Sequence, residues 1–141
     1  MIRLTEKHRR EIERHGEEVF PNECCGFLVG DAASGLRSVR EVWPATNGRG
    51  DSPKNRYIVP PLEVVRAELE CRRRGLDVVG YYHSHPNAPA RPSSFDREHA
   101  WADYSYVIVS VAKGKAESMA SWVVSDPDGP FVEETMAESE T

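Results

Sequence analysis

The 141-residue sequence contains no run of about 18 apolar residues, which excludes an ordinary membrane-spanning helix. Residues 1–7 also lack an apolar stretch of the signal-peptide type. These two absences predict a protein that neither crosses a membrane nor is secreted. We therefore expect no membrane partner and a cytoplasmic location.

Cysteine is scarce, since the chain has only three, and two of them, Cys24 and Cys25, are adjacent. An odd number with two neighbours does not suit a disulfide framework, so we expect Cys24, Cys25 and Cys71 to be buried thiols. A zinc site built on Cys24 or Cys25 would lack the usual Cys-x-x-Cys spacing. The role of this adjacent pair stays open at this point.

Positive charge is also limited, because 18 Lys and Arg face 23 Asp and Glu, for a net charge of −5. The only basic cluster is Arg72, Arg73 and Arg74, near the end of an expected helix. Basic side chains at that end complement the helix dipole, which explains the cluster without a ligand. Nucleic acid is therefore not expected as a partner.

The chain is long enough, with 39% hydrophobic residues, to bury a core without disulfides. Sequence patterns predict helices over residues 5–19, 62–74 and 93–101, and strands over residues 24–30, 36–43, 56–59, 77–82, 104–111, 116–124 and 131–133. The fold class is α/β (α+β), a single mixed β-sheet flanked by helices. We expect one domain over residues 1–134 and a disordered acidic tail over residues 135–141.

Two predictions concern the helices. In the helix over residues 62–74, Leu62, Val65 and Leu69 recur at helical spacing, which predicts that this helix packs on the sheet. His8 and His15 lie on the first helix, and no spacing relates them to other candidate site residues. We expect both to lie at the surface or at the boundary of the core.

The chemically richest stretch is residues 81–96, which contains His83, Ser84, His85, Ser93 and Asp96. His83 and His85 follow a β-branched and aromatic run that predicts a buried strand. Residues two apart on a strand point to the same face, so the two imidazoles are expected to converge while Ser84 points away. Three prolines then predict a rigid loop before Ser93.

Residues 93–96 read Ser-Ser-Phe-Asp, which has the form of a capping box at the start of a helix. This would place the Asp96 carboxylate in the first helical turn, where a short loop can bring it back to the histidines. Two neutral imidazoles and one carboxylate suit a borderline ion such as Zn²⁺, with a fourth position left for water.

Simpler interpretations exist for each of these residues. A His-x-His pair at a strand end is often only a pair of polar edge residues, and capping and the helix dipole explain Asp96 without a metal. Glu23, which precedes the predicted strand over residues 24–30, could be a solvent-exposed glutamate. Only the joint spacing of the ligand candidates favours a metal site.

That spacing, His83-x-His85, seven residues, Ser93, two residues and Asp96, resembles the pattern of the JAMM (MPN+, JAB) metallopeptidases. The family's upstream glutamate motif, Pro-x-Glu-x-Cys-Gly, matches residues 21–26. The resemblance implies a JAB/MPN-like (cytidine-deaminase-like) fold and one Zn²⁺ per chain, held by His83, His85 and Asp96. It also implies that Glu23 is the general base and that Ser93 stabilises the oxyanion.

By the same resemblance, this looks like the compact, stand-alone prokaryotic form. It implies a peptidase or isopeptidase that cleaves at the C-terminal Gly-Gly tail of a ubiquitin-like or sulfur-carrier protein of the ThiS or MoaD kind, or releases cysteine from such a carrier. The loop over residues 44–55 is the expected substrate contact. The alternatives are a RadC-like, DNA-associated JAB protein without peptidase activity, and a metal-free MPN− scaffold, which the complete ligand set disfavours.

Overall fold

Eight strands and three helices are present in the computed structural model, which describes residues 1–48 and 59–139. They are β1 (Ile2–Thr5), α1 (Glu6–Val19), β2 (Cys25–Ala33), β3 (Leu36–Ala45), α2 (Pro61–Arg74), β4 (Asp77–Pro86), α3 (Ser94–Glu98), β5 (Ser105–Ala112), β6 (Lys115–Val124), β7 (Phe131–Glu134) and β8 (Met136–Ser139). All eight strands form one mixed sheet in the order β7-β6-β5-β4-β2-β3-β1-β8. The predicted fold class is thus confirmed.

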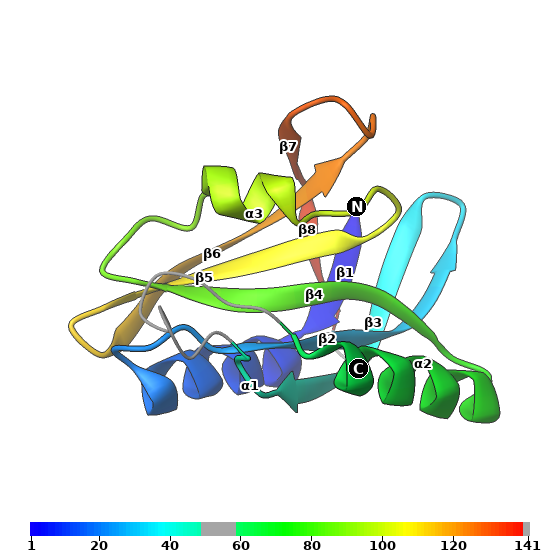
Figure 1. The fold of residues 1–141 in the computed structure, drawn as a ribbon, viewed down its shortest axis with the longest axis horizontal. Coiled ribbons are helices and arrows are strands. Elements are labelled where there is room, and N and C mark those ends of the chain that lie inside the picture. The colour runs from blue at the N-terminus through cyan, green and yellow to red at the C-terminus, as the bar shows by residue number, and fades with distance from the viewer. Residues whose placement is uncertain (49–58, 140–141) are drawn as a thin grey trace.

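Strand β4 lies in the middle of the sheet, antiparallel to β2 and parallel to β5. Figure 1 shows β4 crossing the centre of the molecule, with α3 on one side and α1 and α2 on the other. Strands β2 and β3 form a hairpin, since they pair antiparallel across a turn in which Ser34 and Gly35 have φ angles of 53° and 77°. None of the described helices is long and apolar enough to cross a membrane.

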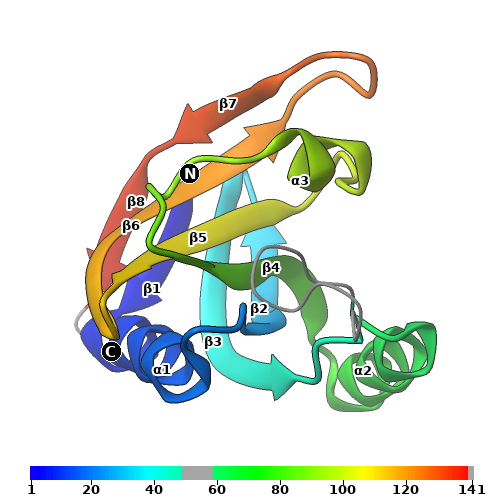
Figure 2. The same ribbon diagram turned by 60° about the vertical axis from the view of Figure 1, so that its left-hand side comes forward.

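The sheet curls until its two outer strands are joined by a single residue, Thr135. Figure 2 shows β7 leading into β8 around the outside of the sheet. The prediction of a disordered tail is therefore wrong for Met136–Ser139, which pair in parallel with β1. Backbone hydrogen bonding and the packing of Met136 against the core order this segment, and composition reveals neither.

Helix α1 begins where the sequence predicts, with Thr5 as its N-cap. The prediction for His8 is wrong, because its side chain is buried. His8 completes a capping box by accepting from the Thr5 amide through Nδ1 at 3.2 Å, and its Nε2 lies 3.0 Å from the Arg40 carbonyl oxygen. His15 lies at the boundary of the core, as expected, and its Nδ1 is 2.8 Å from the Tyr82 hydroxyl.

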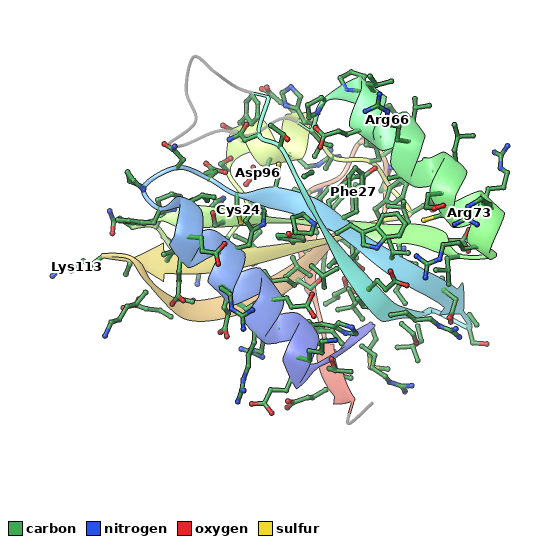
Figure 3. All side chains as sticks on the ribbon, turned by 90° about the horizontal axis from the view of Figure 1, so that it is seen from below. Cys24, Phe27, Arg66, Arg73, Asp96 and Lys113 are labelled. Atoms are coloured by element: carbon green, nitrogen blue, oxygen red, sulfur yellow. The ribbon has the colours of Figure 1, made fainter. Side chains whose placement is uncertain are left out.

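Helix α2 packs on the sheet as predicted, but not through the expected residues. Leu62, Val65 and Leu69 are between 52% and 58% exposed, whereas Ala67 and Cys71 are buried. Figure 3 shows Phe27 lying between α2 and the sheet, and Arg66 and Arg73 on the outer side of the helix. Small side chains on the inner face let the helix approach the sheet closely, and this close packing decides which face of α2 points toward the sheet.

Candidate metal centre

Strand β4 presents the two histidines. His83 and His85 lie on one face of this strand, 0% and 8% exposed, because alternate residues of a strand point the same way. Ser84 points to the other face, where its Cβ lies near Gly16 of α1 and its hydroxyl accepts from the Cys24 amide at 2.8 Å. The predicted convergence of the two imidazoles is found.

Helix α3 brings the carboxylate to the same place. The capping box is confirmed, since the Asp96 amide donates to Ser93 Oγ at 3.1 Å and the Ser93 amide donates to Asp96 Oδ2 at 2.8 Å. The helix is shorter than predicted and ends at Glu98. Asp96 therefore caps α3 and also lies beside the two histidines.

Three candidate ligand atoms meet at nearly equal distances. The Nε2 atoms of His83 and His85 lie 3.2 Å apart, and Asp96 Oδ2 lies 3.2 and 3.1 Å from them. Atoms bound to one tetrahedral zinc ion at about 2.0–2.1 Å are separated by about 3.3–3.4 Å. The donor set and its spacing therefore fit a zinc ion with these three protein ligands.

The orientation of His85 is held by a backbone carbonyl. Its Nδ1 lies 2.9 Å from the Pro89 oxygen, which only accepts hydrogen bonds, so Nδ1 must carry the proton. In the neutral ring this leaves the Nε2 lone pair directed at His83 and Asp96. A hydrogen bond to the distal ring nitrogen is the usual way in which a protein orients a metal-binding histidine.

The loop after β4 is attached to the sheet at several points. The Asn87 amide donates to the Val111 carbonyl at 2.7 Å, and Ser110 Oγ donates to the Ala88 carbonyl at 2.6 Å. Trp122 Nε1 donates to the Ala90 carbonyl at 3.0 Å. These bonds keep the loop in one arrangement, so the ligands that it joins are preorganised.

The electrostatics of the cluster favour a cation. Burial acts to raise the pKa of Asp96, but hydrogen bonding with His83 and His85 and from the Ser93 amide lowers it well below its usual range. Burial lowers the pKa of His83. For His85, burial acts in the same direction, but the Asp96 carboxylate and the Pro89 carbonyl outweigh it and raise the pKa. These pKa shifts favour an ionised Asp96 beside a protonated His85, so the site attracts positive charge.

Glu23 lies beside this cluster, only 4% exposed. Its backbone carbonyl accepts from Asn47 Nδ2 at 3.2 Å, which ties it to the end of β3. Within the described part of the chain its Oε1 has no hydrogen-bond partner. The ligand atoms of Glu23, His83 and His85 all lie within 4.8 Å of one another. The structure thus rejects the exposed-glutamate interpretation and brings all the metal-site candidates together.

Burial is the main cause that raises the pKa of Glu23 to about 8, with His85 opposing the rise and Asp96 adding to it. A buried carboxyl group with a pKa near neutrality is suited to accept and return a proton. A cation held by the histidines would oppose this rise, because it stabilises the carboxylate.

A pocket of about 250 Å³ opens at the cluster, and its polar side chains are those of Glu23, His85, Arg91 and Ser93. Arg91 was not singled out from the sequence, because the family pattern counts the positions between His85 and Ser93 without specifying them. The orienting role of Pro89 was missed too. A backbone carbonyl orients His85, and every residue has one, so the residue type does not reveal this role.

The adjacent cysteines lie next to the site but behave as buried thiols. Cys24, Cys25 and Cys71 are free and buried, as the sequence predicts. Burial raises the pKa of Cys24 to about 12 and also raises that of Cys25. Thiols that stay protonated are poor nucleophiles and poor metal ligands, so the histidines and carboxylates are the better candidates for metal binding and catalysis.

The curled sheet, the His-x-His strand and the capped Ser-x-x-Asp helix define a JAB-type domain with a candidate metal centre. Comparison of the sequence with known families confirms the type of domain. The chain belongs to the prokaryotic homologs of the JAB domain (Prok-JAB), which match residues 5–125. The resemblance to JAMM proteins is thereby confirmed.

Two curated relatives are similar to this chain. A desampylase of Haloferax volcanii is 41% identical over 91 residues, which are 64% of this chain and 63% of that protein. A probable TtuB-protein conjugate cleaving protease of Thermus thermophilus is 39% identical over 105 residues, 74% of this chain and 64% of that protein. The match thus spans slightly less than two thirds of either relative.

A solved structure covers the whole fold. The solution structure of a Desulfitobacterium hafniense protein is 34% identical, with a TM-score of 0.87, and the match covers 100% of this chain and 94% of that one. A Salinibacter ruber protein, also 34% identical, has a TM-score of 0.75, with coverage of 99% and 92%. Two experimentally determined structures therefore share this fold over nearly their whole length.

Proposed function

We propose that this protein is a zinc-dependent metallopeptidase that cleaves the amide or isopeptide bond at the C-terminal Gly-Gly tail of a ubiquitin-like or sulfur-carrier protein. The observation that carries the proposal is the convergence of His83, His85 and Asp96 beside the buried Glu23. The names of the two curated relatives, a desampylase and a conjugate cleaving protease, support the substrate class. The same chemistry would release cysteine from a carrier that ends in it.

His83, His85 and Asp96 would hold one zinc ion. A zinc ion with three protein ligands lowers the pKa of a coordinated water to about 7 and polarises a substrate carbonyl. Glu23 then accepts the proton of the attacking water and returns it to the leaving amine as the C–N bond breaks. Its burial and its unpartnered Oε1 suit this transfer, because no competing donor within the described residues engages that oxygen.

Ser93 would donate a hydrogen bond to the oxyanion that develops on the substrate carbonyl. Its Oγ already accepts from the Asp96 amide, and the residue lines the pocket beside Glu23. A hydroxyl can accept one hydrogen bond and donate another. Capping the helix and contacting the substrate are therefore compatible.

Ser93→Ala is expected to lower both stability and turnover, since it removes the cap and the donor. Loss of an N-cap costs about 0.5–2 kcal/mol, and loss of one oxyanion donor about 100–1,000-fold in kcat. Ser93→Asp keeps a capping oxygen without a donor, so the free energy of unfolding should recover while turnover does not. Denaturant unfolding and steady-state kinetics measure the two effects, and recovery of turnover in Ser93→Asp would exclude the oxyanion role.

A Gly-Gly tail has no side chains, so the enzyme should bind its backbone in an extended form, most simply as an added strand. The wall that we predict for it, residues 47–57, lies outside the described residues except for Asn47 and Gly48. The side-chain amide of Asn47 donates to the backbone carbonyl of Glu23, which supports a position beside that residue for the start of this wall.

Replacing the last glycine of a cognate carrier by valine is expected to abolish cleavage, because a β-branched side chain cannot approach the metal centre as closely as glycine does. Mass spectrometry of carrier fusions measures the cleavage. Substitutions on the far surface of the carrier serve as controls and should have little effect. Efficient cleavage after Gly-Val, or cleavage of unfolded peptides at many sites, would contradict tail specificity.

A further inference from the structure

Arg91 is a cation at the catalytic pocket to which the proposed reaction assigns no task. It is the only arginine or lysine among the described residues that line this pocket, which it shares with Glu23, His85 and Ser93. The side chain is exposed, and within residues 1–48 and 59–139 its guanidinium makes no ion pair or hydrogen bond. Other surface arginines do have an acidic partner, as Arg10 does with Glu6 and Arg40 with Asp31.

The backbone of Arg91 is held by the same atom that orients the metal ligand. The Pro89 carbonyl lies 2.8 Å from the Arg91 amide and 2.9 Å from His85 Nδ1. The next carbonyl, that of Ala90, accepts from Trp122 Nε1. These hydrogen bonds therefore fix the start of the arginine side chain relative to His85, so its charge stays close to the site.

We propose that Arg91 binds the carboxylate of a single amino acid that is amide-linked to the carrier's terminal glycine and leaves on cleavage. This role of Arg91 rests on the proposed function and specifies the leaving group of the proposed hydrolysis. In such a substrate the α-carboxylate carbon is two bonds from the scissile nitrogen. Glu23 must reach that nitrogen to protonate it, so the carboxylate falls within the pocket that Glu23 and Arg91 share.

The chemistry and the size of the pocket both favour this leaving group. A guanidinium offers a planar fork of N–H donors that matches a carboxylate. The volume of about 250 Å³ lies below the roughly 300–1,000 Å³ of sites for drug-sized ligands and suits about one residue. A lysine side chain in an isopeptide bond carries no carboxylate near the scissile nitrogen, so it leaves Arg91 without a partner.

The reaction stays a simple hydrolysis. Water adds its oxygen to the glycine carbonyl, the C–N bond breaks, and the amino acid leaves as the amine with the proton that Glu23 returns. Arg91 exchanges no proton and binds the carboxylate before and after cleavage. Its loss should therefore act mainly on KM, because the contact is equally strong in the bound substrate and in the transition state.

The test uses the zinc-reconstituted full chain and one carrier with three leaving groups: alanine with a free carboxylate, alanine amide, and aspartate amide. Wild type is expected to cleave the free acid with a kcat/KM about 10–100-fold above that for alanine amide. Arg91→Gln should remove this preference by raising the KM for the free acid, without changing the kinetics on alanine amide. Arg91→Lys should keep part of the preference. Arg10→Gln, on the exposed face of α1, is the matched control.

The outcomes separate the two proposals. A fourth carrier, joined to a lysine side chain through an isopeptide bond, separates the two failures. If wild type cleaves neither this conjugate nor the other three carriers, the proposed function fails, whereas cleavage of the isopeptide conjugate alone shows that the role of Arg91 is wrong. If it cleaves free acid and amide equally, or if Arg91→Gln leaves the preference intact, the function stands and the role of Arg91 is wrong. Aspartate amide cleaved as well as the free acid would show recognition of a side-chain carboxylate and overturn the α-carboxylate assignment. Calorimetric binding of the free-acid carrier to Glu23→Gln, weakened by adding Arg91→Gln, is a supporting readout without turnover.

Discussion

Glu23→Gln is expected to lower kcat by about 100–10,000-fold while the protein keeps its metal and its fold. Glutamine preserves the size of the side chain, but an amide cannot accept the proton of the attacking water. The loss should therefore appear in turnover and not in metal content. Steady-state kinetics on a carrier fusion, together with elemental analysis and circular dichroism, measures all three properties.

Glu117→Gln is the matched control, because it removes an exposed carboxylate from β6 and should leave kcat unchanged. The proximity of Glu23 to both histidines also allows it to be a ligand, so the metal content of the variant decides between two mechanisms. A Glu23→Gln protein that sheds its zinc would identify Glu23 as a ligand, and the general-base role would be wrong.

The second large effect concerns the metal. Wild type is expected to hold about one zinc per chain after reconstitution and dialysis, and His83→Ala and Asp96→Ala are expected to lose both the zinc and all activity. Each variant leaves two ligands, and two ligands bind zinc far more weakly than three. Elemental analysis gives the metal content, and the melting temperature with and without zinc reports whether binding stabilises the fold.

Asp96 also caps α3, so its replacement by alanine mixes two effects. Asp96→Asn can still accept from the Ser93 amide and should retain the helix cap, yet a neutral amide is a poorer zinc ligand. His99→Ala removes an exposed imidazole at the end of α3 and should keep full zinc content. Stoichiometric zinc in His83→Ala, or its absence from reconstituted wild type, would rule out the site.

Much of the candidate site was predictable because its geometry is local. The alternation of a strand is enough to put His83 and His85 on one face, and the capping pattern is enough to start a helix at Ser94 with Asp96 in its first turn. The spacing between these two elements then matches a known family. Glu23, by contrast, could be connected to the site only through the family pattern, since nothing in its own surroundings in the chain distinguishes it from an exposed glutamate.

The wrong prediction for α2 concerns which face of the helix packs on the sheet. Helix α2 has two apolar stripes, and the sequence favoured Leu62, Val65 and Leu69, yet the sheet accepts the face with Ala67 and Cys71. A stripe of large residues and a stripe of small ones have the same helical period. Only the shape of the surface beneath the helix distinguishes them.

By itself, the sequence determined which residues are candidates for the site and the order in which strand, loop and capped helix present them. Both depend on contacts between near neighbours in the chain. The tertiary structure decided the burial of Glu23, the pairing of β8 with β1 and the position of Arg91 in the pocket. Each of these depends on segments that are distant in the chain and meet only when the sheet curls. Burial and electrostatic coupling arise when these segments meet, so the pKa of Glu23 is raised only in the folded protein.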